Sequence, residues 1–238
     1  MIHGSQENPM KRWPFMFLAI AAALVVLKVH AADSAADEAG FVSIFNGHDL
    51  SGWKYGMWGN HENKVGKGYS ATDGVISCTP TDGGDLYTEK EYADFILRFE
   101  FKLAANANNG IAIRSPAQGD AAYTGMEIQV LDDSGSWYTH LHEWQYHGSI
   151  YDVVPAQRGH LQPVGEWNSE EIRAQGRHIT VILNGATIVD ANLDDVKDPT
   201  ILRHHGGLKR TTGHIGFLGH QSRVEFRNLR IKDLTGGK

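Results

Sequence analysis

One segment constrains the fold of this chain more than any other: residues 94–103, in which large apolar side chains occupy every second position. These apolar side chains are Phe95, Leu97, Phe99, Phe101 and Leu103. A period of two places one side of an extended strand against a hydrophobic core and leaves the other side in water. The segment therefore predicts a half-buried β-strand.

The same alternation recurs at residues 178–184, where Ile179, Val181 and Leu183 share one face. Asn184-Gly185 follows, a dipeptide that favours a tight hairpin turn, and a second apolar run begins at residue 187. Only residues 195–201 suggest a short helix. Many short strands separated by turns rich in Gly and Asn predict a single all-β domain, a sandwich or jelly roll.

The last predicted strand contains a break in its pattern. Val224 and Phe226 share one face, but Leu229 and Ile231 fall in the opposite phase. Because side chains alternate strictly along a strand, one extra residue is needed to return all four to the core. We therefore expect a β-bulge at residues 227–228.

The N-terminus predicts export. Lys11 and Arg12 precede an apolar run at residues 15–29, and residues 29–31 supply small side chains for a signal peptidase. Residues 1–31 are expected to be a cleaved signal peptide, residues 32–40 a disordered lead-in, and residues 41–234 the domain. A retained membrane anchor is the alternative, although Lys28 shortens the uncharged run below the roughly 18–20 residues of a membrane span. A periplasmic or extracellular protein with no stable span is the expectation.

Charge and cysteine content narrow the partners. The chain has 22 basic and 28 acidic residues, of which the leader holds three and one, so residues 32–238 carry a net charge of −8. An acidic surface argues against nucleic acid or an anionic membrane as the partner. The single cysteine, Cys78, excludes an internal disulfide and is expected to be core packing.

The outward faces of two predicted strands offer the first candidate site residues. Met126, Ile128 and Val130 form a core-facing row, so Glu127 and Gln129 stand side by side on the opposite face, about 6–7 Å apart. Asp132 ends this strand, and Arg114 is expected on the outer face of a strand at residues 108–114. A carboxyl, an amide and a guanidinium in one hollow could move a proton and hold a sugar. Ordinary solvated strand faces would give the same pattern.

A second candidate region, residues 137–151, is dense in aromatic and histidine side chains. Trp144 and Tyr151 suit the C–H faces of sugars, and His147 is a candidate acid or base because histidine titrates near neutrality. Further residues with possible roles are His140, His142 and Glu143 as weak metal ligands, and His214 or His220 as a side chain reaching the cleft. Signatures of a serine hydrolase, a zinc protease or a nucleotide-binding loop are absent from the sequence.

A series of segments resembles the 3-keto-disaccharide hydrolase domain family over residues 41–234. The segments include FVSIFNGHDLSGW (41–53), NGIAIR (109–114), GMEIQVLD (125–132), GSIY (148–151), GEWN (165–168), GHIGF (213–217) and FRNL (226–229). The resemblance implies a concanavalin A-like jelly roll of two antiparallel sheets. It also implies an enzyme that acts on glycosides oxidised to a ketone at C3.

That activity implies removal of the C2 proton, β-elimination at C1 and hydration of the product. By analogy, Glu127 or His147 is the base, and the other or Asp132 is the acid. Arg114 and Gln129 would bind substrate and stabilise the enolate, a role that a divalent metal bridging O2 and O3 could also fill. A sugar 3-dehydrogenase is implied upstream as the source of the ketone.

Two other functions remain open at this point. One is a non-catalytic carbohydrate-binding module. The other is a conventional glycosidase, but the spacing E-x-D-x-x-E of retaining glucanases reads Glu127, Gln129 and Asp132 in this chain. A retaining carboxylate pair needs a separation of roughly 5–5.5 Å. Glu127 and Asp132 are poorly suited to this distance, because Asp132 is one carbon shorter than the Glu at the corresponding position of the motif.

Overall fold

The computed structural model describes residue 1 and residues 38–56, 68–81 and 83–236. The predicted signal peptide and most of the predicted lead-in lie outside the described residues. The chain divides into two units, Met1–Gly40 and Phe41–Lys238, and all the strands and helices below belong to the second. In the described ranges, no helix combines the length and apolarity needed to cross a membrane.

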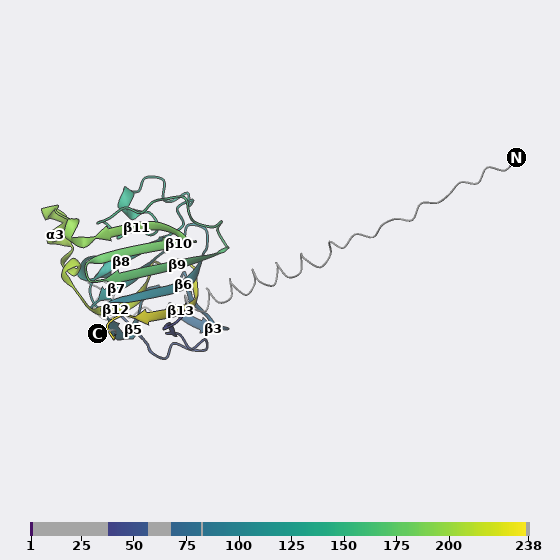
Figure 1. The fold of residues 1–238 in the computed structure, drawn as a ribbon, viewed down its shortest axis with the longest axis horizontal. Coiled ribbons are helices and arrows are strands. Elements are labelled where there is room, and N and C mark those ends of the chain that lie inside the picture. The colour runs from purple at the N-terminus through teal and green to yellow at the C-terminus, as the bar shows by residue number, and fades with distance from the viewer. Residues whose placement is uncertain (2–37, 57–67, 82, 237–238) are drawn as a thin grey trace. The chain divides into compact units, whose positions relative to one another are not determined.

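Two antiparallel sheets form the fold, which confirms the predicted all-β jelly-roll sandwich (Figure 1). Sheet A has the strand order β11-β10-β9-β6-β13-β4-β3, with β1 paired to β13, and sheet B has the order β2-β5-β12-β7-β8. The strands of sheet A are β1 (Val42–Ser43), β3 (Tyr69–Thr72), β4 (Val75–Cys78), β6 (Phe95–Leu103), β9 (Trp167–Gln175), β10 (His178–Leu183), β11 (Ala186–Asn192) and β13 (Val224–Asp233). Those of sheet B are β2 (Trp53–Tyr55), β5 (Gly84–Tyr92), β7 (Asn108–Ser115), β8 (Met126–Leu131) and β12 (Gly213–Gly219).

The helices are short and lie between strands. They are α2 (Ala121–Thr124), α3 (Pro199–His204) and the 3₁₀ turns η1 (Glu143–Gln145), η2 (Leu193–Asp195) and η3 (Gly206–Lys209). The expected helix at residues 195–201 is divided between η2 and α3, because Asp198 caps the backbone N–H groups of Thr200 and Ile201 and starts a new helix there.

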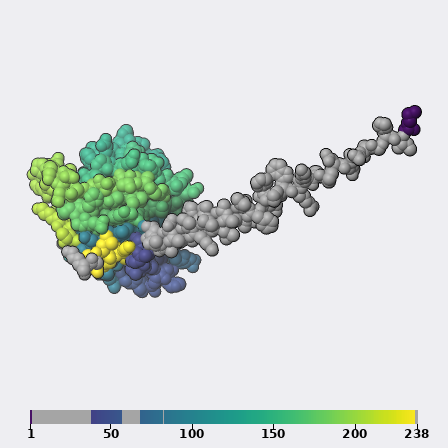
Figure 2. All heavy atoms as spheres, viewed as in Figure 1, coloured from purple at the N-terminus to yellow at the C-terminus, as the bar shows by residue number. Residues whose placement is uncertain are grey.

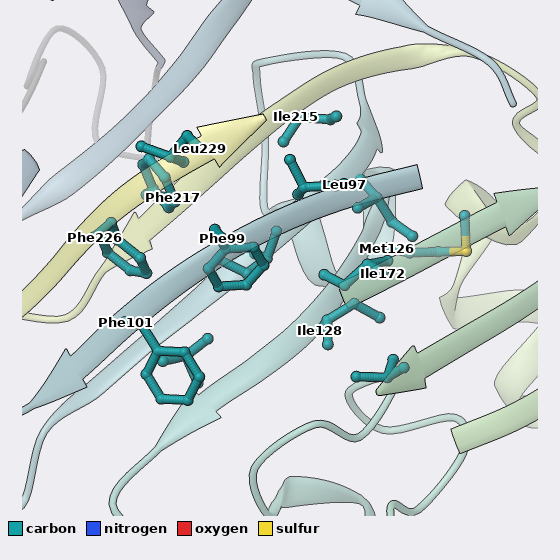
Figure 3. Packing of buried hydrophobic residues seen from close by; sticks show 14 of the residues in the cluster. Leu97, Phe99, Phe101, Met126, Ile128, Ile172, Ile215, Phe217, Phe226 and Leu229 are labelled. Carbon is teal, nitrogen blue, oxygen red and sulfur yellow. The ribbon is translucent and has the colours of Figure 1, made fainter. Parts of the chain in front are cut away.

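The core lies between the two sheets and is rich in phenylalanine. The alternate apolar residues of β6 are all buried, as predicted, and they meet Met126 and Ile128 of sheet B (Figure 3). Phe217 of β12 and Phe226 of β13 stack with ring centroids 4.0 Å apart. Aromatic packing of this kind replaces the disulfides that the chain lacks as its source of stability.

The two predicted backbone features are both present. Asn184 and Gly185 adopt positive φ angles of 50° and 86° between β10 and β11, as a tight hairpin turn requires. The register of β13 against β6 shifts between Arg227 and Arg230, and Asn228 has a φ of 53°. This bulge buries Leu229 and Ile231 together with Val224.

The outer face of sheet A is polar. Ion pairs cross its strands between Arg98 and Glu171, Lys102 and Glu225, and Arg227 and Glu100. In Figure 2, the green segments that include β9, β10 and β11 make up much of this side of the molecule. The chemistry-bearing side chains lie instead on the outer face of sheet B.

Candidate active site

The pairing of β7 with β8 sets which side chains leave the core of sheet B. Ile111 pairs with Ile128 on the core side, whereas Ala112 pairs with Glu127 and Gly110 with Gln129. The side chains of Glu127 and Gln129 therefore point to the outer face of the sheet, as their alternation predicts.

A cavity of about 290 Å³ lies over this part of sheet B. Three carboxyl groups contribute to its walls, those of Asp85, Asp120 and Glu127. The other polar side chains in its described walls are Asn108, Tyr123, Gln129, Tyr138, Gln145, Tyr151 and His220. Lysine and arginine are absent from the described residues that line it, so the cavity suits an uncharged ligand rich in hydroxyl groups.

Two glycines on the strands of sheet B make room for side chains of the neighbouring strands. A Cβ atom at Gly110 would lie 2.2 Å from Glu127 Oε1, and one at Gly216 would lie 2.4 Å from the ring of Tyr87. The Glu127 carboxyl thus rests directly on the backbone of β7, and the Tyr87 ring rests on β12. Glycine is required at both positions because any side chain would displace these groups.

Glu127 is a buried carboxyl inside a polar cavity. Its side chain is almost inaccessible, with the residue 6% exposed. Burial, followed by the charges of Asp120 and Asp85, raises the pKa of Glu127 to about 8. A carboxyl with this pKa holds a proton at neutral pH and can donate it, which is a property of catalytic acids.

Asp85 is a second perturbed carboxyl, and it is not among the residues predicted from the sequence. The residue is 1% exposed; its Oδ2 accepts a hydrogen bond from the Tyr87 hydroxyl at 3.2 Å, and its Oδ1 has no partner among the described residues. Burial raises the pKa of Asp85 to about 7, opposed by the Tyr87 hydrogen bond and assisted by Asp120. An unpartnered buried oxygen is costly, and in a cavity wall it is a ready acceptor for a ligand proton.

A turn that pairs with β8 completes the cavity wall beside Glu127. Gly148 N–H donates to Gln129 O, Gln129 N–H to Ser149 O, and Tyr151 N–H to Glu127 O. Tyr151 is thereby held next to Glu127, and its hydroxyl accepts a hydrogen bond from Gln145 Nε2 at 3.0 Å. The Tyr151 O–H and the Gln129 amide are donors that a sugar oxygen could use.

Arg114 does not line the cavity, so the prediction that its side chain faces the Glu127 site is wrong. Its side chain is 1% exposed and donates to Ala93 O, Gly176 O and Asp94 Oδ1, at one end of the sandwich. Arg114 has a φ of 49°, and the β12 register shifts between His214 and Gly216 opposite it. This irregularity ends the alternation of β7 after Ile113, so that Arg114 ties together turns rather than facing substrate.

His147 also lies outside the cavity walls, contrary to expectation. Its ring is buried against Phe101 of β6, with centroids 5.0 Å apart. His147 Nδ1 accepts the Leu131 N–H, so Nε2 carries the proton and donates it to Glu170 Oε2 at 3.0 Å. The geometry gives His147 a structural role between the sheets, because its ring nitrogens are both engaged there.

Asp132 is engaged in loop structure and is not in the cavity either. Its Oδ2 accepts from Asn106 N–H at 2.8 Å, and its Oδ1 accepts from the N–H and hydroxyl of Ser134. Asp132 borders a separate hollow that also contains Asp133 and Arg158. The turn after β8 carries its carboxyl away from Glu127.

The remaining candidates divide between the cavity and the surface. His220 lines the cavity at its exposed edge, whereas His214 contacts Lys54 and Glu91 elsewhere on sheet B. Trp144 is half-buried and stacks on His142 at 5.1 Å, outside the cavity walls. His140, His142 and Glu143 do not form a ligand set: across the described part of the chain, no three His, Cys, Asp or Glu side chains are placed to hold a metal.

Comparisons with known proteins agree in pointing to one family. A family model described as the 3-keto-alpha-glucoside-1,2-lyase-like domain matches residues 40–232. The chain is 24% identical over 235 residues to the 3-keto-disaccharide hydrolase of Bacteroides thetaiotaomicron, a match that covers 83% of this chain and 80% of that protein.

Solved structures give the same picture. A proposed glycosyl hydrolase of Parabacteroides distasonis matches with a TM-score of 0.66 and 28% identity, covering 82% of this chain and 99% of that one. A carbohydrate-binding module of Bacillus subtilis matches with a TM-score of 0.50 and 12% identity, over 76% of this chain and 96% of the module. The second likeness is one of fold alone.

Proposed function

The chain belongs to the family of the 3-keto-alpha-glucoside-1,2-lyase-like domain, and from that premise we propose that it cleaves the C1–O bond of glycosides oxidised at C3. Family membership makes the chain a hydrolytic enzyme that acts on carbohydrates. The finer proposal concerns the substrate and the route. We assign the reaction to the cavity over sheet B.

The proposed route is elimination followed by hydration. The C3 ketone acidifies the C2–H bond, so a base can take the C2 proton and leave an enolate with its charge on O3. The enolate electrons then expel the C1 substituent, whose oxygen takes a proton from an acid, and a C1=C2 double bond forms. Addition of water, hydroxyl to C1 and proton to C2, gives net hydrolysis. This route needs one acid, one base and donors at O3.

The pair of Glu127 and Asp85 is the observation that carries the proposal. Two buried carboxyls with pKa values near 8 and 7 line the same cavity. Between about pH 7 and 8, Glu127 has the higher pKa and holds its proton, so it can act as the acid, whereas Asp85 is the carboxyl that is more often ionised and can act as the base. Donors for the enolate come from the Tyr151 hydroxyl and the Gln129 amide.

An assay with matched sugars tests the proposal. Purified protein is mixed with the native and the 3-keto forms of one chromogenic glucoside, with and without a chelator. We expect release of the chromophore from the 3-keto form alone, because only that form has an acidic C2 proton. Cleavage of the native glucoside alone would make the protein a conventional glycosidase. Loss of activity with chelator would assign enolate stabilisation to a metal rather than to Tyr151 and Gln129.

The pH profile should report the carboxyl pair. Below about pH 7 both carboxyls hold protons and no base is present; above about pH 8 both are ionised and no acid is present. We therefore expect kcat/KM to be bell-shaped, with a maximum between about pH 7 and 8 and apparent pKa values that belong to the coupled pair. Steady-state rates on the 3-keto glucoside measure it. A rate that rises without a maximum through this range would contradict a two-carboxyl mechanism.

The setting of the enzyme is part of the same proposal. The leader pattern at residues 1–31 supports export, which the N-terminal residue of protein recovered from the cell envelope would test. The chemistry requires an oxidant that converts the C3 hydroxyl to a ketone beforehand. We propose a sugar 3-dehydrogenase as the supplier.

A further inference from the structure

The cavity is small compared with the expected substrate. Its volume of about 290 Å³ is at the lower limit of the roughly 300–1,000 Å³ in which pockets enclose drug-sized ligands. One sugar ring with its hydroxyl groups fills such a space. The group that leaves from C1 must therefore project out of the cavity, past the residues at its mouth.

Trp137 belongs to the loop after β8 that supplies part of the cavity wall. The next residue, Tyr138, lines the cavity, as does Leu141. Trp137 is 76% exposed, more than any other aromatic side chain among the described residues. An indole held in water leaves a large, flat apolar face free to pack against a ligand ring.

The loop that carries Trp137 is held firmly. Trp137 N–H donates to Asn106 Oδ1 at 3.1 Å, and Asn106 N–H donates to Asp132 Oδ2. Tyr138 N–H donates to Gly135 O, whose own N–H donates to Asp132 O. At Gly135 a Cβ atom would lie 2.7 Å from Asn106 Oδ1, so the loop can close in this way only around glycine. A surface that is already ordered loses little conformational entropy on binding.

We propose that Trp137 is the platform for the leaving group, which stacks on the indole while the 3-keto ring occupies the cavity. The proposal rests on the function assigned above. Sugar rings and aromatic aglycones present flat C–H or π faces of about the size of an indole, whereas a methyl group offers almost no such contact. Trp137 thus makes the enzyme selective for glycosides with a ring at C1, such as disaccharides and aryl glycosides.

The kinetic test compares two substrates and three variants. For Trp137→Ala we expect KM to rise about tenfold for a 3-keto-disaccharide with kcat nearly unchanged, since stacking is lost equally in ground and transition states. Methyl 3-keto-glucoside should show no change. Trp137→Tyr should restore most of the loss, and Leu202→Ala, an exposed apolar side chain on α3, serves as the control. Equal effects of Trp137→Ala on both substrates would overturn the platform.

Calorimetric binding of the unoxidised disaccharide and of its monosaccharide tests the Trp137 platform separately from the proposed cleavage of 3-keto-glycosides. We expect Trp137→Ala to weaken only the disaccharide, by a similar factor. If the wild type turns over neither 3-keto substrate, and Trp137→Ala still weakens binding of the disaccharide but not of the monosaccharide, the catalytic proposal fails and the platform stands. If Trp137→Ala leaves disaccharide affinity unchanged, the platform is overturned whatever the turnover.

Discussion

Replacing Glu127 with Gln is expected to lower kcat for a 3-keto-glucoside by a factor of about 10²–10⁴, the usual contribution of a positioned proton-transfer group. Gln keeps the shape of the side chain over Gly110 but cannot exchange a proton with substrate. Binding of the unoxidised glucoside should be nearly unchanged. Single-turnover kinetics together with calorimetry would separate the lost chemistry from retained affinity.

The same replacement has an internal check on folding. The pKa of Glu127 is raised in the folded protein, so above the unfolded pKa of about 4.3 the unfolded chain loses this proton while the folded protein still holds it. The free energy of unfolding contributed by Glu127 therefore falls as pH rises through this range. Glu127→Gln should therefore be at least as stable as the wild type at neutral pH. Glu89→Gln, an exposed position on β5 of the same sheet, is the matched control and should retain full activity. A Glu127→Gln enzyme of normal kcat would remove Glu127 from the mechanism.

Replacing His147 with Leu is expected to cost about 3–5 kcal/mol of unfolding free energy, because it leaves Glu170 buried without its partner. The two side chains meet between the sheets, where both are almost completely inaccessible. Removing one member of such a pair strands the other in a medium of low polarity. Urea unfolding at neutral pH measures the loss.

A double-mutant cycle gives this prediction its control. Replacing both His147 and Glu170 with Leu should recover most of the lost stability, since an apolar pair needs no compensation. The folded fraction of His147→Leu should keep a kcat close to that of the wild type. A collapse of kcat with unfolding free energy intact would instead return His147 to the role of acid or base that its sequence context suggested.

Features of the fold that depend on local patterns could be predicted from the sequence. The alternation in β6, the Asn184-Gly185 turn and the bulge at Asn228 each follow from a rule that operates over a few residues. Arg114 shows where this reasoning fails. Its alternation is broken by a positive φ opposite a register shift in β12, and that shift involves a strand about 100 residues further along the chain.

The site could be predicted only in part, for the same reason. Glu127 and Gln129 lie on one regular strand, so the sequence alternation correctly predicts that both side chains lie on the same outer face. Asp85 also alternates regularly with Leu86, but its face and its role depend on β5 pairing with β12 and on α2 above it. Asp132 and His147 sit in turns, where the direction of a side chain is decided by distant partners rather than by sequence period.

The two glycines, Gly110 and Gly216, have a consequence for how this fold could acquire new substrates. Gly110 lies against the Glu127 carboxyl and Gly216 against the Tyr87 ring, so neither position has room for a side chain. A larger residue at Gly110 would push the Glu127 carboxyl out of position, and one at Gly216 would displace the Tyr87 ring, whose hydroxyl donates a hydrogen bond to Asp85. Diversification must therefore proceed around the rim, through the loops that bear Trp137 and Tyr151, and directed evolution of this scaffold should sample those loops while holding the two glycines constant.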